Sequence, residues 1–222
     1  MLKSEKRTLG DQTYERLLAG ICDLTYPPGH KLSEAQVAQA FGVSRAPVRD
    51  AFLRLERHGF VRIIPQVGTI VRSIDLKRAR DICQLRMVLE SFAARKAAEA
   101  IDDAQKRALY TRFTLLMQIQ DDAAFREAIA SVDMFLHDLV LQLCGNEEIL
   151  RVIHQCKPVI ECIRNTNAEW GNRRATRARE QRQIAAALLR SDPDAAEAAM
   201  AAHIRSIQTT IEQLMEKRLA YC

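Results

Sequence analysis

Two short amphipathic helices on either side of a tight turn are the feature that most restricts how this chain can fold. Ser33-Glu-Ala-Gln36 has the pattern of a capping box, and Gly42 ends the helix that this box begins. Ser44 caps the next helix, whose apolar residues recur every three or four positions until His58-Gly59. After Gly59 the period changes, and β-prone runs at 60–64 and 69–73 predict a small hairpin.

A further helix is expected before this pair, with Asp11 as its N-cap and the Tyr26-Pro-Pro-Gly29 turn after its end. Three helices followed by a two-stranded wing are the order of a winged helix-turn-helix. That fold lays its recognition helix in the major groove of DNA. Residues 1–75 are therefore predicted to form a DNA-binding domain.

The rest of the chain has helical periodicity almost throughout. Helices are expected at 76–100, 103–119, 121–144, 146–168, 173–190 and 193–217. Pro193 follows Asp192, which fits a first-turn proline behind a capping residue. We therefore predict a mainly α protein, in which a winged helix-turn-helix is followed by an all-α antiparallel helical bundle over 76–222.

The charge and the apolar runs of the chain exclude several classes of protein. A formal net charge of +5 is compatible with a polyanionic partner without demonstrating one. The longest apolar runs, such as 184–189, are too short to span a bilayer, and no signal-peptide core follows the charged start. We expect a cytoplasmic protein with no membrane partner. The 6 cysteines are widely spaced and are assigned no function.

The start of the second short helix carries residues suited to DNA. Arg45 and Arg49 are four residues apart and share one exposed face, whereas Val48 and Phe52 face the core. Guanidinium groups near a helix N-terminus suit guanine edges and phosphates, and Ser44 with the free N–H groups there can bind a phosphate. An ordinary solvated helix face is the alternative interpretation of the two arginines.

Pro28-Gly-His-Lys-Leu-Ser-Glu34, Phe41-Gly-Val-Ser-Arg-Ala-Pro-Val-Arg-Asp50 and Leu55-Glu-Arg-His-Gly59 closely resemble the amino-terminal domain of the GntR family of bacterial transcription regulators. The resemblance spans about residues 11–72. It implies that Arg45 and Arg49 are the main DNA-contacting residues, with Ser44 and Ala46 at neighbouring contact positions and Gly68 at the wing tip near the minor groove. Many relatives have Arg at the position of Ala35, so one expected contact is missing here.

Three potential metal ligands occur in the helical part. Asp133 and His137 are four residues apart and project from one face of a helix, and His203 lies among apolar residues on the last helix. A carboxylate with two imidazoles suits Zn or Ni. The alternative is a core histidine satisfied by Asp133, with His203 independent of both. The neighbours that point this face inward are apolar: Met134, Val140 and Leu141.

Arg86-Met-Val-Leu-Glu90, Asp133-x-x-x-His137, Gly145-Asn146 and the stretch from Ile184 to His203 look like the FCD effector domain of the FadR-type GntR branch, over about residues 78–215. Many members of that branch bind a metal through the Asp, the His four residues on and two further histidines. The resemblance implies Asp133, His137 and His203 as ligands. Where another histidine is expected after Glu180, this chain has Gln181, whose amide oxygen is a poorer ligand.

Arg86 is a candidate for holding an effector carboxylate, and an internal salt bridge to Glu90 is the equally weighted alternative. A solvated basic stretch at a helix start and three further histidines are assigned no specific task. These are Arg173, Arg174, Arg177, Arg179, His30, His58 and His154.

Together these features predict a dimeric, ligand-responsive transcription regulator, most simply a repressor, and not an enzyme. It would bind a palindromic double-stranded DNA operator and sense a small organic acid in its helical domain. A constitutive DNA-binding protein with a degenerate effector site is the main alternative. A metal-dependent hydrolase using the same Asp133, His137 and His203 is a remote one, because no H-E-x-x-H or comparable motif is present.

Overall fold

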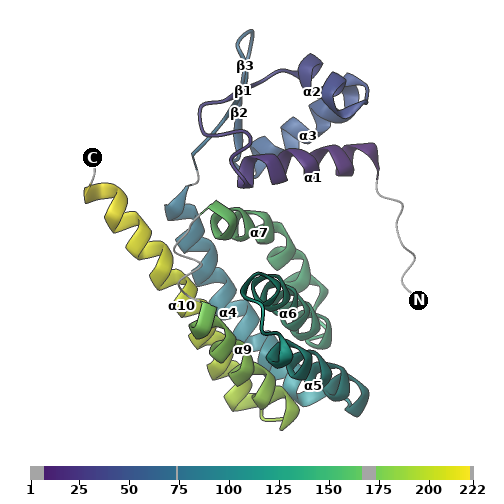
Figure 1. Ribbon diagram of the computed structural model, residues 1–222, viewed down its shortest axis with the longest axis vertical. Helices are drawn as coiled ribbons and strands as arrows, with labels where there is room; N and C mark the ends of the chain where they lie inside the picture. The colour runs from purple at the N-terminus through teal and green to yellow at the C-terminus, as the bar shows by residue number, and fades with distance from the viewer. Residues whose placement is uncertain (1–7, 74, 167–173, 221–222) are drawn as a thin grey trace. The chain divides into compact units, whose positions relative to one another are not determined.

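The structure, a computed structural model, describes residues 8–73, 75–166 and 174–220. The chain divides into two compact units, residues 1–75 with 157–168, and residues 76–156 with 169–222. Figure 1 labels the elements of both units in chain order. None of the helices in the described ranges is both long and apolar enough to cross a membrane.

The first unit contains a winged helix-turn-helix. Its elements are α1 (Leu9–Cys22), β1 (Lys31–Leu32), α2 (Glu34–Phe41), α3 (Arg45–Arg57), β2 (Val61–Ile64) and β3 (Gly68–Val71). The strands form one antiparallel sheet in the order β1-β3-β2, in which Lys31 pairs with Ile70 and Val61 with Val71. The predicted hairpin is therefore present as β2 and β3. Strand β1 adds a third strand that the sequence did not predict, because two residues are too few to show a sequence period.

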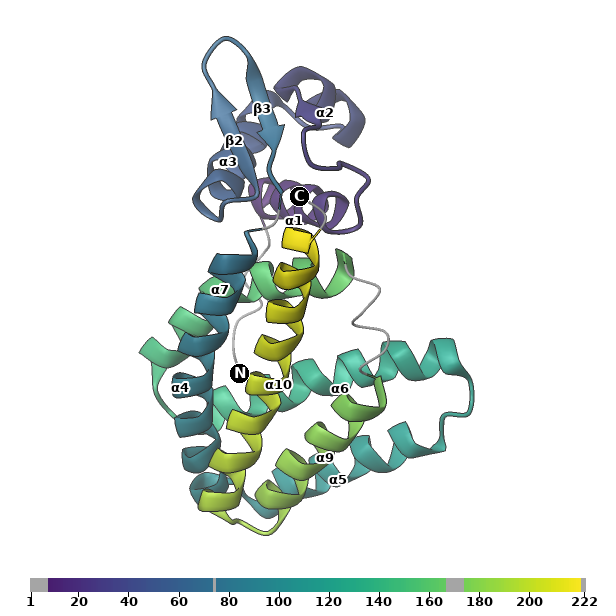
Figure 2. The same cartoon turned by 90° about the vertical axis from the view of Figure 1, so that its left-hand side faces the viewer.

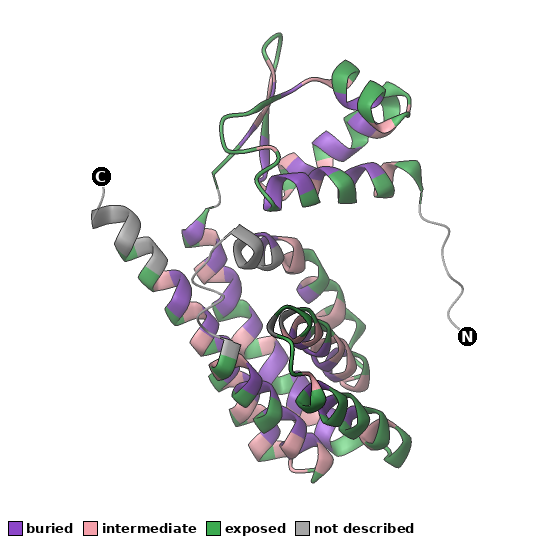
Figure 3. Cartoon of the chain, in the orientation of Figure 1, coloured by how far each residue is buried: buried purple, intermediate pink, exposed green. Residues whose placement is uncertain are grey.

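Helix α3 packs against α1 and α2 through its apolar face. Val48, Phe52 and Leu55 on α3 and Leu17 on α1 are at most 2% exposed. The buried sides of these helices are purple in Figure 3. Gly42 ends α2 in the left-handed conformation (φ 67°), which glycine adopts without steric cost. The turn between α2 and α3 therefore determines how the exposed N-terminus of α3 is oriented.

The N-terminus of α1 differs from the prediction. Thr8, and not Asp11, is the N-cap, and the two residues form a reciprocal capping box. Asp11 is the third residue of the helix, where a carboxylate returns a hydrogen bond to the cap. Ser33 and Ser44 occupy the predicted N-cap positions of α2 and α3, but neither side chain makes a capping hydrogen bond, and the Ser33–Gln36 capping box is not formed.

The second unit is built around a long pair of helices. The helices after residue 75 are α4 (Leu76–Ala100), α5 (Asp103–Gln118), α6 (Asp122–Leu143), α7 (Glu147–Thr166), α9 (Arg174–Leu189) and α10 (Pro193–Ala220). The part of α7 from residue 157 onward is grouped with the first unit. Helix α10 lies along α4, as the two views in Figures 1 and 2 agree, and α4 also contacts α6 and α9. Pro193 begins α10, and the carboxylate of Asp192 accepts from Ala195 N, as predicted. The mainly α fold is confirmed.

Candidate functional site

The predicted DNA-contacting residues lie at the exposed start of α3. Ser44 is the N-cap, and Arg45, Ala46 and Arg49 are all exposed in the first five residues of the helix. Because Arg45 and Arg49 are one turn apart, both guanidinium groups leave the helix on the same side. The opposite face of α3 is buried against α1 and α2, whereas the face with Arg45 and Arg49 is exposed and can contact a partner.

Arg49 has a partner within the protein. Its Nε donates to Oε1 of Glu34 and its Nη2 to Oε2, each over 3.1 Å. The hydrogen bonds from Arg49 lower the pKa of the Glu34 carboxyl, and Glu34 in turn raises the pKa of Arg49. The Arg49 side chain is still 67% exposed. Sequence reasoning missed this pair, because the two residues lie on different helices.

Gly68 begins β3 at the wing, where its φ of 124° is a conformation that L side chains rarely adopt. A Cβ atom there would lie 3.0 Å from Cε of Lys31 and 3.6 Å from the carbonyl oxygen of Leu32. Glycine is thus required by the turn of the wing itself. Any contact of Gly68 with a minor groove stays a prediction.

The three predicted metal ligands come together between α6 and α10. Asp133 and His137 lie one turn apart on α6, and His203 lies on α10. The Nε2 atoms of the two histidines are 3.3 Å apart. Oδ1 of Asp133 lies 3.8 Å from Nε2 of His137 and 3.7 Å from Nε2 of His203. Within the described residues these three side chains form the one group with spacing suited to a metal ion.

The other nitrogen of each histidine faces a buried carboxylate. Nδ1 of His137 donates to Oε2 of Glu90 on α4, and Nδ1 of His203 donates to Oε2 of Glu180 on α9, over 3.0 Å. An ionised carboxylate only accepts hydrogen bonds, so each Nδ1 carries the proton. In the neutral imidazoles both Nε2 atoms then present lone pairs to the centre. Carboxylates in this outer position orient metal-binding histidines and fix their tautomer.

His203 is 1% exposed. Burial lowers its pKa, against the opposing effects of Glu180 and Asp133. The structure therefore favours the neutral form of His203, which is the form that binds metals.

The carboxylate of Asp133 also receives two donors from α9. Nη2 of Arg177 donates to Oδ2 and Nε2 of Gln181 donates to Oδ1, each over 2.7 Å. The prediction of a solvated basic stretch is therefore wrong at Arg177, whose side chain is 16% exposed and pairs with Asp133. One predicted neighbour also differs, since Met134 is 44% exposed and does not share the inward face of Asp133.

Gln181 faces the site although it is not an imidazole. It is fully buried, and Nε2 also donates weakly to the carbonyl of Ile129, over 3.4 Å. Among the described residues its Oε1 finds no hydrogen-bond donor. A buried acceptor without a partner is costly, and a cation or a water molecule would satisfy it.

Arg86 adopts the alternative that the sequence left open, because its Nε donates to Oε1 of Glu90 in a buried ion pair. Burial alone would raise the pKa of Glu90, but Arg86 and His137 lower it to about 2. Arg86 therefore supports His137 through Glu90. A contact between Arg86 and an effector stays a prediction.

Three carboxylates surround the two imidazoles. Glu90 pairs with Arg86 and His137, Asp133 pairs with Arg177, and Glu180 pairs with His203. Imidazole nitrogens and carboxylate oxygens are ligands of divalent Zn and Ni, so this set of side chains is suited to a cation.

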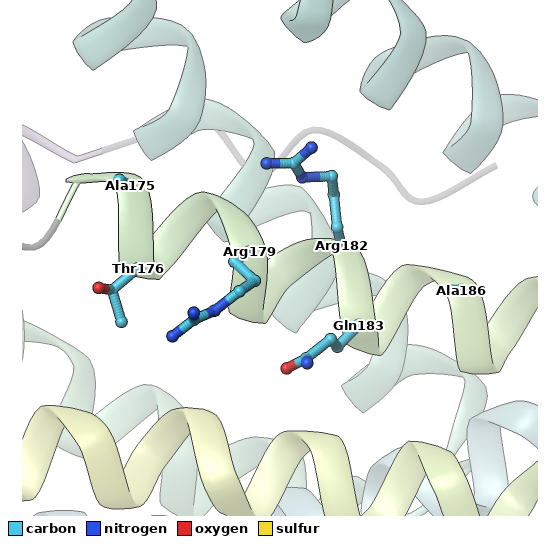
Figure 4. A pocket seen from close by; sticks show the side chains of 6 residues that line it. All are labelled: Ala175, Thr176, Arg179, Arg182, Gln183 and Ala186. Carbon is cyan, nitrogen blue, oxygen red and sulfur yellow. The ribbon is translucent and has the colours of Figure 1, made fainter.

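The opposite face of α9 is open and does not belong to this site. Figure 4 shows the side chains that line a depression along it, and all of them come from α9. The lining residues are Ala175, Thr176, Arg179, Arg182, Gln183 and Ala186. Because Arg177, Glu180 and Gln181 point to the other side of the helix, the depression gives no access to the histidines through these residues.

The sequence indicated the three candidate ligands but not the residues that contact their far sides. Glu90 is 47 positions from His137, and Glu180 is 23 positions from His203. No local spacing joins such pairs. The single available signal was the occurrence of charged residues within otherwise apolar helix faces.

Both parts of the chain match known protein families. Residues 9–71 match the family described as bacterial regulatory proteins, gntR family, and residues 81–206 match the FCD domain. The HTH-type transcriptional repressor RspR of Escherichia coli (strain K12) is 28% identical over 213 residues, covering 94% of this chain and 91% of the relative. YdhC of Bacillus subtilis (strain 168), an uncharacterized HTH-type transcriptional regulator, is 24% identical, covering 93% and 92%.

Solved structures agree on the fold. E. coli McbR/YncC superposes with a TM-score of 0.74 at 19% sequence identity, covering 94% of this chain and 99% of that one. A GntR regulator from Rhodococcus sp. RHA1 gives a TM-score of 0.73 at 19% identity, covering 92% and 97%. At this level of identity the similarity shows the architecture alone.

Proposed function

Since the chain belongs to the gntR family of bacterial regulatory proteins and is a transcriptional regulator with an FCD domain, we propose that it represses transcription as a dimer on a palindromic operator. In this proposal a metal in the helical domain binds a small organic acid, which changes the affinity of the dimer for DNA. The family is one of regulators and not of enzymes, so a hydrolase role for the histidines is set aside.

The exposed start of α3 supports operator binding. Arg45 and Arg49 present guanidinium groups on one face, and Ser44 and Ala46 flank them. Such groups match the O6 and N7 acceptors of guanine or a phosphate oxygen. The wing with Gly68 is the second element that would contact the duplex.

Exposed apolar side chains on α4 support a dimer. Leu85, Val88 and Phe92 are 42%, 66% and 44% exposed, and their spacing places them along one side of the helix. A cluster of large exposed apolar residues commonly marks a contact surface. A two-fold dimer would present two recognition helices to the two halves of a palindrome.

The opposed Nε2 atoms of His137 and His203 are the observation that carries the metal site. Two lone pairs held 3.3 Å apart repel each other unless a proton or a cation lies between them. His137 and His203 would hold a Zn or Ni ion through these two nitrogens, whose 3.3 Å separation lets both bind the same ion. Asp133 would supply a third ligand, and Oε1 of Gln181, which has no donor among the described residues, would supply a fourth.

An organic acid suits the remaining coordination positions, because carboxylate oxygens can replace water on such a metal. Effector control then requires the ligand to bind the DNA-competent and incompetent forms with different affinity, by roughly 1–3 kcal/mol. The proposed direction is repression relieved by the acid, in keeping with the repressor names of RspR and of NanR from Enterobacter sp. (strain 638).

One experiment tests these parts together. Metal-stripped protein is screened by thermal shift with Zn²⁺ or Ni²⁺, with and without a panel of mono-, di- and tricarboxylic acids. DNA affinity is then measured with the same additions. Stabilisation by metal, a further shift by an acid and weaker DNA binding in its presence are expected. If no metal and no acid changes stability or DNA affinity, the constitutive DNA-binding alternative replaces the proposal.

A further inference from the structure

The side chain of Glu34 on α2 holds the guanidinium of Arg49 on α3 along one edge. Both Nε and Nη2 of Arg49 donate to the carboxylate, each over 3.1 Å. This bidentate pairing fixes the plane and the direction of a guanidinium more firmly than a single hydrogen bond does. Because the partners come from the two helices of the helix-turn-helix, the orientation of Arg49 depends on the packing of α2 against α3.

The pairing leaves a defined part of Arg49 free. An arginine has five N–H donors in a fixed fork. Glu34 uses Nε and one N–H of Nη2, so both N–H groups of Nη1 and one of Nη2 remain. The 67% exposure of the Arg49 side chain leaves this end open to solvent. One N–H group of Nη1 and the free N–H group of Nη2 point in parallel from this end, and they match the O6 and N7 acceptors of guanine.

The pairing also changes how Arg49 acts on the phosphate backbone. Non-specific DNA binding comes from cations that neutralise phosphates and release counterions. The Arg49–Glu34 pair as a whole has no net charge, and the carboxylate itself repels phosphates. The attraction of Arg49 to any DNA phosphate is therefore weaker, whereas its remaining N–H groups can still donate hydrogen bonds to a base.

We propose that Glu34 is a positioning residue that raises the discrimination of the protein between its operator and other DNA. The inference rests on the proposed function, since it requires Arg49 to meet a base. Glu34 orients the free N–H groups of Arg49 toward the groove. Its carboxylate also offsets the positive charge of Arg49, which reduces the attraction of Arg49 to phosphates. Arg49 and Arg45 both keep the pKa of the Glu34 carboxyl below its usual value, so the carboxylate is ionised at neutral pH.

The test compares binding to two duplexes of equal length. One is the tightest duplex selected from a random-sequence pool with the wild-type protein, and the other is its scrambled sequence. For Glu34→Gln and Glu34→Ala, the ratio of the two affinities should fall about tenfold or more. Binding to scrambled DNA should tighten, and its salt dependence should steepen by about 0.9, because the released Arg49 gains a phosphate.

Glu15→Gln is the matched control, since it removes the same charge from an exposed position on α1. Thermal unfolding followed by circular dichroism checks that each variant is folded. In an Arg49→Ala background, Glu34→Ala should not change the ratio further.

Two outcomes separate this inference from the proposed function. If Arg49→Ala lowers the affinity ratio but neither Glu34 variant does, the positioning role of Glu34 is wrong and the base contact of Arg49 stands. If Arg49→Ala leaves the ratio unchanged, the base contact in the proposed function is wrong, and the role of Glu34 falls with it.

Discussion

The Nε2 atoms of His137 on α6 and His203 on α10 face each other at a distance of 3.3 Å, although the two residues are 66 positions apart in the chain. The Nδ1 atom of each ring donates a hydrogen bond to a buried glutamate, and this hydrogen bond fixes the proton on Nδ1. The two helices are thereby joined at a point where only a proton or a cation can balance the facing lone pairs. A metal at this point would link α6 and α10, so its binding should respond to residues on both helices and on those that support them.

Gln181→His should bind Zn²⁺ or Ni²⁺ about 10–100-fold more tightly than the wild type, since an imidazole is a better donor than an amide oxygen. The substitution also frees Oδ1 of Asp133 from its hydrogen bond with Gln181. Titration against a competing chelator measures the gain, which should vanish when His203→Ala is added. Gln183→His is the control, because Gln183 lies on the exposed face of the same helix. Equal affinities of wild type and Gln181→His would mean that residue 181 takes no part in coordination.

Glu180→Gln should weaken metal binding by about 10–100-fold, because the carboxylate that orients the His203 ring is lost. The amide can still meet Nδ1, so the fold should persist, and circular dichroism checks this. The same chelator titration gives the affinity. Unchanged metal affinity in a folded Glu180→Gln protein would show that the orientation of His203 does not depend on Glu180.

Glu90→Gln should lower the free energy of unfolding by about 3–5 kcal/mol, because it leaves the buried guanidinium of Arg86 without its counter-charge. Urea unfolding of the metal-free protein measures this. Glu99→Gln on the same helix breaks exposed ion pairs with Arg95 and Lys96 and should cost at most about 1 kcal/mol. A similar small loss for both variants would contradict the buried ion pair.

Arg49→Ala should cost on the order of 1–3 kcal/mol at the operator, with a smaller loss on random DNA, if Arg49 makes a bidentate base contact. Titrations at one fixed salt concentration compare the two duplexes. Arg57→Ala, at the other end of α3, should weaken both to a similar extent or not at all. Equal weakening by Arg49→Ala on both duplexes would indicate that Arg49 touches phosphate only.

Val88→Glu should convert the dimer to a monomer, because it places a charge in the proposed apolar contact formed with Leu85 and Phe92. Sedimentation velocity measures the state, and operator binding should be lost with the dimer. Tyr110→Glu is the control, since Tyr110 on α5 is 63% exposed and lies outside the proposed contact. If the Val88→Glu variant is still a dimer and still binds the operator, the dimer interface does not include Val88.

Several features were determined by the sequence alone. The turn at Gly42, the start of α10 at Pro193 and the apolar stripe of α3 follow from interactions between residues at most four positions apart. Capping, glycine conformation and side-chain periodicity act over this range. The winged helix-turn-helix, the helical part and the candidate ligands Asp133, His137 and His203 could therefore be predicted from local patterns of residues.

Other features were decided only by tertiary structure. Strand β1 exists because β3 offers it a partner. Glu90 reaches His137 across 47 positions, and Glu34 reaches Arg49 across 15. Such contacts depend on which helix faces pack together. Local propensities do not encode that choice, since it is made by burial of the whole apolar surface at once.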